Sequence, residues 1–317
     1  MVLACISLVI LYSIYGLGPF TGMEQKIMKR EEILAKQDKS MFTHIHWTKE
    51  GPEYHFRTNT TSCKDFKTRF AKVNTLPIRA LASFPGSGNT WVRYLIEGAT
   101  GVYTGSIFND RSILRAGHYG EGRDYKDGST IMQKTHHRSL YLDKYKGYEL
   151  KWRETHIMTF QGRAVLVVRN PYRAILSYWN FFTTQSHTNT ISEHSFVSNK
   201  FKDFVFTGAS RWFEVINDWI NMGNDVYFIF YEDLVEDPVT EMRKLMDYLG
   251  FPADEGRLSC ISHHLVGSFH RTVHQLSDPF TPSHHLKIRS VIEKAQQIIK
   301  EKTGRDIPID KYEYYKT

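Results

Sequence analysis

Apolar residues gather along the chain in short runs, and amphipathic stretches separate these runs. Four runs have the length of strands and are rich in Val, Ile, Leu, Phe and Tyr: residues 78–84, 129–135, 164–170 and 225–234. Such near-continuous apolar runs are typical of parallel strands that are covered on both faces. Helical spacing of apolar residues predicts helices over residues 89–97, 171–181, 211–221, 238–249 and 283–302. This alternation predicts an α/β fold, a three-layer αβα sandwich with a central parallel sheet that binds ligands at the carboxyl ends of its strands.

The first apolar run is longer than any of these. It extends from Val2 to Gly22 without a charged side chain, which is about the length of a helix that crosses a bilayer. We expect a signal-anchor transmembrane segment at residues 1–22, because no basic segment precedes the run and no clear Ala-x-Ala site follows it. A cleaved signal peptide is the alternative. Residues 23–75 are interpreted as a stem and irregular lead-in to one domain over residues 76–317.

Composition narrows the choice of partners and compartment. The 317 residues include 41 Lys and Arg against 34 Asp and Glu, and the formal net charge of +7 favours anionic ligands. The chain has no long basic block and no recognisable nucleic-acid module, so nucleic acid is not an expected partner. Asn59-Thr60-Thr61 is an N-glycosylation sequon, and Cys63 and Cys260 are the only cysteines outside the first apolar run. These cysteines either pair in a secretory compartment or are small buried residues.

A strand-to-helix junction with the composition of a phosphate-binding turn follows the first predicted strand. Residues 85–88, Pro-Gly-Ser-Gly, turn the chain, and Asn89 or Thr90 begins the helix. Backbone N–H groups, the helix dipole and the hydroxyls of Ser87 and Thr90 can bind an anion there. The turn departs from the nucleoside-triphosphatase pattern GxxxxGK[ST], because no lysine precedes the final hydroxyl residue. Alternatively, the turn only connects a strand to a helix.

A second junction of the same kind follows the third predicted strand. Arg169 comes directly after an apolar run, Pro171 suits the first position of a helix, and Ser177 lies further along that helix. The paired donors of an arginine and a serine hydroxyl can bind one phosphate group. The alternative is a structural ion pair at Arg169 and a surface position at Ser177. Two such junctions in one sheet favour phosphate binding.

With these motifs the chain resembles the sulfotransferase family that uses 3′-phosphoadenosine 5′-phosphosulfate (PAPS). The 5′-phosphosulfate loop of that family, PKxGTTW, is similar to residues 85–91, and its 3′-phosphate motif is similar to residues 169–177. The resemblance continues in QKTHH, RWFEVINDW and FIFYEDLVEDPVTEMRKLMDYLGF and covers residues 78–280. It is strongest for the sulfotransferase module of WSC domain-containing proteins, which share FPGSGNTWVRYLIE. The resemblance implies a P-loop-like αβα sandwich.

The resemblance also implies a site for the co-substrate. Residues of the first junction are expected to hold the 5′-phosphosulfate, with Trp91 near adenine or in the helix core. Arg169 and Ser177 are expected to hold the 3′-phosphate, and Arg271 is the nearest match to a further basic contact, although the Arg-Lys-Gly pattern of the family is absent. The expected co-substrate residues are Pro85, Gly86, Ser87, Gly88, Asn89, Thr90, Trp91, Arg169, Ser177 and Arg271.

The loop lysine of that family is replaced by Gly86, so its positive charge must come from elsewhere. The family has a second contact from the lysine of a Lys-Thr-His segment, which resembles Lys134-Thr135-His136 here. Residues two apart in an extended chain point the same way, so Lys134 and His136 can face one ligand. We predict that Lys134 stabilises charge on the leaving phosphate and that His136 is the general base. The adjacent His137 is an alternative base.

The predicted function is therefore transfer of a sulfuryl group from PAPS to a hydroxyl of a glycan, with no metal required. The WSC-like resemblance implies sialylated acceptors, and the segment with Asp110, Arg111, Arg115 and Arg123 either recognises an acidic glycan or is a solvated loop. The paired histidines at 263–264 and 284–285 lack partners at zinc-ligand spacing. A P-loop-type nucleotide kinase and a non-catalytic glycan-binding relative are the alternatives. The anchor predicts a single-pass type II protein of the Golgi membrane with a luminal domain.

Overall fold

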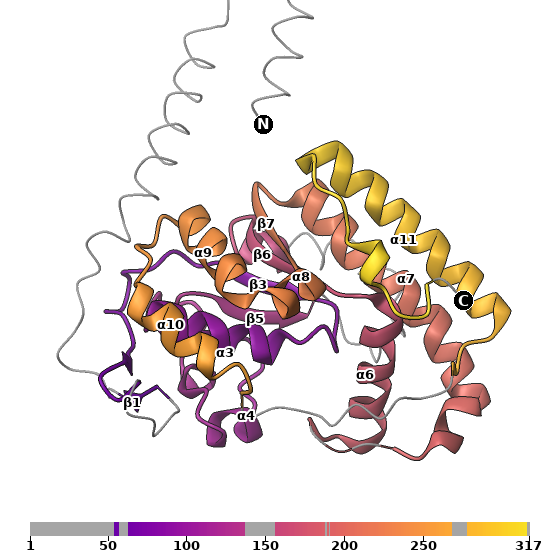
Figure 1. The fold of residues 1–317 in the computed structure, drawn as a ribbon, viewed down its shortest axis with the longest axis horizontal. Helices are drawn as coiled ribbons and strands as arrows, with labels where there is room; N and C mark the ends of the chain where they lie inside the picture. The colour runs from indigo at the N-terminus through magenta and orange to yellow at the C-terminus, as the bar shows by residue number, and fades with distance from the viewer. Residues whose placement is uncertain are drawn as a thin grey trace, which may run out of the picture.

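A five-stranded parallel sheet forms the centre of the fold in the computed structural model, with strand order β4-β5-β3-β6-β7 (Figure 1). The structure describes residues 54–56, 63–136, 156–187, 189, 191–267 and 278–315. The strands of the sheet are β3 (Ala80–Ser83), β4 (Gly105–Ser106), β5 (Gln133–His136), β6 (Arg163–Val168) and β7 (Asp225–Phe230). Ser83 pairs in register with both His136 and Val167, so the carboxyl ends of these strands lie at one edge.

Helices cover both faces of the sheet. They are α3 (Asn89–Thr100), α4 (Arg111–Arg115), α6 (Pro171–Thr184), α7 (Asn199–Met222), α8 (Tyr231–Glu236), α9 (Pro238–Leu249), α10 (Glu255–His263) and α11 (Pro282–Thr303). Alternate residues of β6 enter opposite cores: Leu166 packs with α6, α7 and α11, and Val165 packs with α3, α9 and α10. Figure 1 shows the two groups of helices on either side of the sheet. The predicted three-layer αβα sandwich is thereby confirmed.

The strand predicted over residues 225–234 is too long. β7 ends at Phe230, and α8 begins at Tyr231. Glu232 and Asp233 lie in the first turn of α8, where acidic side chains interact favourably with the helix dipole. The apolar run in the sequence extends past the end of β7 because Leu234, which lies in α8, is also buried.

Two further boundaries differ from the prediction. The helix predicted over residues 211–221 begins at Asn199, because the Ser198 side chain caps it by accepting a hydrogen bond from the Phe201 N–H group (3.2 Å). The strand predicted over residues 129–135 is shorter and lies later, at Gln133–His136. Its first residues instead bond to the lead-in segment: the Ala71 N–H group donates to the Ser129 carbonyl (2.9 Å).

A disulfide joins Cys63 to Cys260 on α10, across 197 positions of sequence. Of the two alternatives for these cysteines, pairing is therefore the correct one. Near Cys63, the short strands β1 (Tyr54–His55) and β2 (Lys67–Thr68) form an antiparallel pair. The predicted anchor at residues 1–22 and the sequon at Asn59 lie outside the described residues. Within the described part of the chain, no helix combines the length and apolar composition needed to cross a membrane.

Candidate active site

The loop between β3 and α3 is shaped by two glycines with left-handed backbones. Gly86 has φ +82° and Gly88 has φ +81°. A Cβ atom at position 86 would lie 2.3 Å from the Ala174 carbonyl oxygen, and one at position 88 would lie 2.3 Å from Cε2 of Tyr231. Both positions therefore require glycine. The loop therefore packs directly against α6 at Gly86 and against α8 at Gly88.

The amino terminus of α3 opens from this loop. Gly88 is the N-cap residue, and no side chain supplies a capping hydrogen bond. The side chain of Ser87 is buried, and its Oγ has no hydrogen-bond partner among the described residues. Unsatisfied buried hydroxyls are rare, so this atom indicates a place for a ligand oxygen. Together with the helix dipole, this hydroxyl could bind an anion at the amino terminus of α3.

Arg169, the first residue after β6, joins the two junctions. Its Nη1 donates to the Gly86 carbonyl (2.8 Å), and its guanidinium lies 4.3 Å from the ring centre of Tyr231. The Nε of Arg169 is buried without a partner among the described residues. Ser177 is also adjacent, because the Cβ position of Gly86 lies 3.2 Å from Ser177 Cβ. The structure thus brings Arg169, Ser177 and the glycine loop together.

Asn170, the residue after Arg169, is held by three hydrogen bonds. The Asn170 N–H group donates to Glu232 Oε1 (2.9 Å), and Asn170 Nδ2 donates to the Glu313 carbonyl (3.0 Å). Its Oδ1 accepts from the Tyr172 N–H group (3.0 Å) and caps α6. The segment after α11 therefore helps to hold the backbone next to Arg169.

Tyr231 is a residue of this site that the sequence interpretation missed. Its ring packs against Gly88, lies under Arg169, and meets Trp91 edge-on at 5.5 Å between ring centres. Trp91 in turn donates from Nε1 to the Leu265 carbonyl (2.7 Å). The available signal was the position of Tyr231 directly after an apolar strand, which was obscured by extending that strand to residue 234.

Lys134 and His136 lie on β5, the strand next to β3. Both side chains contact the same ring: Lys134 Nζ lies 5.8 Å from the centre of Phe108, and the His136 ring stacks on Phe108 at 5.4 Å. They therefore share one side of the strand, as their spacing of two predicts. Lys134 is buried, with 6% of its surface exposed, and among the described residues no hydrogen bond or ion pair engages its ammonium group. The Phe108 ring, by contrast, is exposed.

The surroundings set the protonation states of this pair. Burial, followed by the positive charge of Lys134, lowers the pKa of His136 to about 3. Burial, followed by the charge of Arg93, lowers the pKa of Lys134 to about 8. At neutral pH the imidazole is thus neutral and most of the lysine is charged. His136 Nδ1 lies 3.0 Å from the Ser83 carbonyl, which only accepts, so the proton lies on Nδ1 and the lone pair on Nε2.

The side chain of Arg93, on α3, makes buried structural contacts. It is fully buried, pairs with Glu121, and donates from Nε to Thr104 Oγ1 (2.7 Å). Glu121 also accepts from the Asp110 N–H group (2.9 Å), and Asp110 Oδ2 lies 3.0 Å from Nε2 of His187. This network ties the segment, for which the sequence left both glycan recognition and a solvated loop open, to α3, the helix that follows the glycine loop. Neither Glu121 nor His187 was predicted from sequence.

The other predicted residues are placed as follows. Pro85, Thr90 and Trp91 are half-buried along the loop and the first turn of α3. Asn89 is buried and turns its amide toward β3. Arg111 and Arg115 are exposed on α4, and Arg123 lies 4.3 Å over the ring of Phe70. Arg271 and His137 lie outside the described residues.

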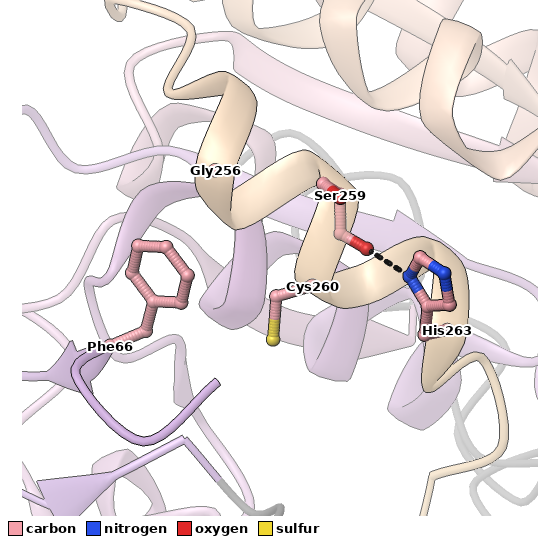
Figure 2. A pocket seen from close by; sticks show the side chains of 5 residues that line it. All are labelled: Phe66, Gly256, Ser259, Cys260 and His263. Carbon is pink, nitrogen blue, oxygen red and sulfur yellow. Dashed lines mark hydrogen bonds between the residues drawn. The ribbon is translucent and has the colours of Figure 1, made fainter. Parts of the chain in front are cut away.

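A cavity of about 310 Å³ lies beside α10, separate from these residues (Figure 2). It is lined by Phe66, Gly256, Ser259, Cys260 and His263. Figure 2 shows the hydrogen bond between the His263 ring and the Ser259 carbonyl (2.8 Å), which lies within α10. This histidine therefore bonds to the last turn of its own helix. Across the described ranges, no three His, Cys, Asp or Glu side chains are grouped so that they could hold a metal ion.

Comparison with known proteins matches residues 80–303 to the family model of the sulfotransferase domain. The WSCD family member CG9164 of Drosophila melanogaster is 32% identical over 251 residues, which are 75% of this chain and 70% of that protein. The WSCD family member GA21586 of Drosophila pseudoobscura pseudoobscura is 32% identical over 240 residues, 72% of this chain and 67% of that protein. Among solved structures, mouse sulfotransferase SULT7A1 complexed with PAP is 16% identical, with a TM-score of 0.45 and coverage of 70% and 85% of the two chains.

Proposed function

Because this chain belongs to the sulfotransferase family, we propose that it transfers a sulfuryl group from PAPS to a hydroxyl group of a glycan. The observation that carries the proposed chemistry is a shared sheet edge. The loop after β3, Arg169 after β6 and the Lys134–His136 pair of β5 all lie at the carboxyl ends of neighbouring parallel strands. Ligands bind at that edge in open α/β sheets.

The two junctions offer separate sites for the two anionic ends of PAPS. Ser87 Oγ and Arg169 Nε are buried polar atoms without partners among the described residues, and phosphate oxygens would satisfy both. Trp91 and Tyr231 lie against the loop between these ends and suit the adenosine. We assign the 5′-phosphosulfate to Ser87, Gly88, Asn89 and Thr90, and the 3′-phosphate to Arg169 and Ser177.

His136 and Lys134 supply the proposed chemistry. When bound, PAPS provides the sulfuryl group. The neutral imidazole of His136 holds a lone pair on Nε2, which accepts the proton of the acceptor hydroxyl as that oxygen attacks. The ammonium group of Lys134 provides positive charge for the leaving phosphate, in place of the loop lysine that Gly86 replaces.

We further propose a sialylated glycan as the acceptor. The formal net charge of +7 and the exposed Arg111 and Arg115 at α4 support an anionic acceptor. The Cys63–Cys260 disulfide supports an oxidising compartment, and a Golgi protein with a luminal domain and an anchor at residues 1–22 is proposed with it. Membership of the sulfotransferase family leaves the kinase alternative without support.

The test is transfer from radiolabelled PAPS to an array of sialylated glycans, their desialylated counterparts and lipid hydroxyls. We expect label on the sialylated glycans, and we expect His136→Gln to lose turnover while it still binds adenosine 3′,5′-bisphosphate. A wild-type protein that binds the bisphosphate but labels no acceptor contradicts the proposed reaction. Equal labelling of desialylated glycans contradicts only the proposed acceptor.

A further inference from the structure

Ser83 lies between the donor loop and His136. It is the last residue of β3, fully buried, and it pairs in register with His136 on β5. Asn89, the first residue of α3, sends its side chain back to the same serine: Asn89 Nδ2 lies 3.1 Å from Ser83 Oγ. On the other side, His136 Nδ1 lies 3.2 Å from that Oγ. One hydroxyl thus contacts both the helix of the donor loop and the histidine.

The orientation of the Asn89 amide is fixed by a second contact. Asn89 Nδ2 also lies 3.0 Å from the carbonyl oxygen of Leu81. A carbonyl oxygen can only accept, so the amide must present its NH₂ group there. The same NH₂ group then donates its other hydrogen to Ser83 Oγ. Asn89 is buried, which makes exchange of these bonds for water costly.

Ser83 presents two oxygens to one ring nitrogen. Its carbonyl lies 3.0 Å and its Oγ lies 3.2 Å from His136 Nδ1. The carbonyl disfavours a lone pair on Nδ1, because two facing lone pairs repel. A proton on Nδ1 satisfies the carbonyl and can be shared with Oγ. An unrestrained serine hydroxyl could instead rotate to donate to Nδ1, which would favour the tautomer with its proton on Nε2.

We propose that Ser83 and Asn89 are positioning residues that hold His136 with its proton on Nδ1 and its lone pair on Nε2. This inference rests on the proposed role of His136 as the general base. Asn89 fixes the Ser83 hydroxyl, and Ser83 fixes the ring. Asn89 is also the first residue of α3, which follows the donor loop. Its side chain therefore links the position of the proposed base to the position of that loop.

The direct test reads the tautomer of His136 by nuclear magnetic resonance. Protein labelled with nitrogen-15 in histidine is measured with adenosine 3′,5′-bisphosphate bound, and loss of a signal in His136→Gln identifies the residue. We expect one neutral tautomer with the proton on Nδ1 in the wild type. Ser83→Ala keeps the carbonyl and has no hydroxyl that could donate to Nδ1, so it is expected to keep the proton on Nδ1 but with a shifted Nδ1 signal, because one of the two acceptors is lost. Ser83→Thr, which keeps an Oγ, is expected to restore the wild-type spectrum.

Turnover separates positioning from general damage. In Ser83→Ala we expect kcat to fall about tenfold, with the bisphosphate Kd within about twofold of the wild type, and Ser83→Thr to recover most of kcat. Asn89→Ala should show a mixture of the two neutral tautomers, because the released Ser83 hydroxyl can turn and donate to Nδ1.

A wild-type His136 with its proton on Nε2 overturns the inference. So does a Ser83→Ala protein with an unchanged spectrum and unchanged kcat. Because the tautomer is measured without an acceptor, a protein that shows the expected spectrum yet transfers no sulfuryl group contradicts the proposed function and not the positioning.

Discussion

The guanidinium of Arg169 donates from Nη1 to the carbonyl of Gly86 at 2.8 Å, across 83 positions of sequence. This bond makes the two strand-to-helix junctions a single structure, because the residue proposed for the 3′-phosphate also holds the loop proposed for the 5′-phosphosulfate. Changes at either end should therefore affect binding of the whole nucleotide.

Arg169→Lys should weaken binding of adenosine 3′,5′-bisphosphate by about tenfold or more, measured by isothermal titration calorimetry. A lysine keeps the charge but loses the planar group that lies on Tyr231 and donates to Gly86. Arg243→Lys is the matched control, since Arg243 forms an exposed ion pair with Glu255. Equal affinities for the wild type and Arg169→Lys would count against the assignment of the 3′-phosphate.

Gly86→Ala should lower the free energy of unfolding by more than about 2 kcal/mol and abolish tight bisphosphate binding. The added Cβ would meet the Ala174 carbonyl at 2.3 Å, at a φ of +82°. Gly304→Ala is the control, because Gly304 has a φ of +69° with nothing within 4 Å of its Cβ position. Urea unfolding of the two variants separates the backbone strain, which they share, from the steric contact, which only Gly86 has.

The pH dependence of kcat/KM should lack an acid limb near 6.5, the ordinary pKa of histidine. A lowered pKa means that His136 stays neutral, and so able to accept a proton, until the pH approaches about 3. On the alkaline side, kcat/KM should fall as pH rises through about 8, because Lys134 then loses its positive charge. Lys134→Arg should move this limb to higher pH, and an alkaline limb that stays in place would assign it to another group.

Lys134→Met should lower kcat by about 10²- to 10³-fold if this lysine provides the charge that the loop lacks. The side chain is similar in length and remains suited to a buried position, so the melting temperature should change little. Stopped-flow or steady-state turnover with saturating PAPS measures the effect. Turnover near the wild-type rate would require another cation.

Arg93 is not expected to be that cation. Arg93→Met should destabilise the fold by about 3–5 kcal/mol, because it leaves the buried carboxylate of Glu121 without its charged partner. The double variant Arg93→Met, Glu121→Leu should recover part of that loss. The folded fraction of each variant should bind adenosine 3′,5′-bisphosphate like the wild type. A loss of affinity in the folded double variant would place Arg93 in the donor site after all.

Local patterns predicted the parts of this site that depend on neighbouring residues. The glycine turn, the arginine after its strand, and the spacing of two between Lys134 and His136 are each visible within about ten positions of sequence. The structure adds that these segments meet, since parallel pairing brings their strand ends to one edge.

Other parts depend on contacts that no local pattern encodes. Glu121 is one acidic residue among 34 Asp and Glu, and only the fold places it against Arg93. Tyr231 was missed because periodicity alone does not separate a strand from a helix within a short apolar run, so the run gave no sign of the end of β7. For the two cysteines, distance in sequence left pairing open, and the packing of α10 near Cys63 decides it.

The position of Gly86 against α6 also has an evolutionary consequence. In this chain a lysine at position 86 is not accommodated by one substitution, because its Cβ would collide with the carbonyl of Ala174. The backbone of α6 would have to shift first, and that shift alone would open a gap beside a glycine. The effect of Gly86→Lys therefore depends on a second change that moves α6, so the two changes are epistatic. Descendants of such a chain are expected to keep the glycine and to change the positive charge near the co-substrate at other positions of the sheet edge.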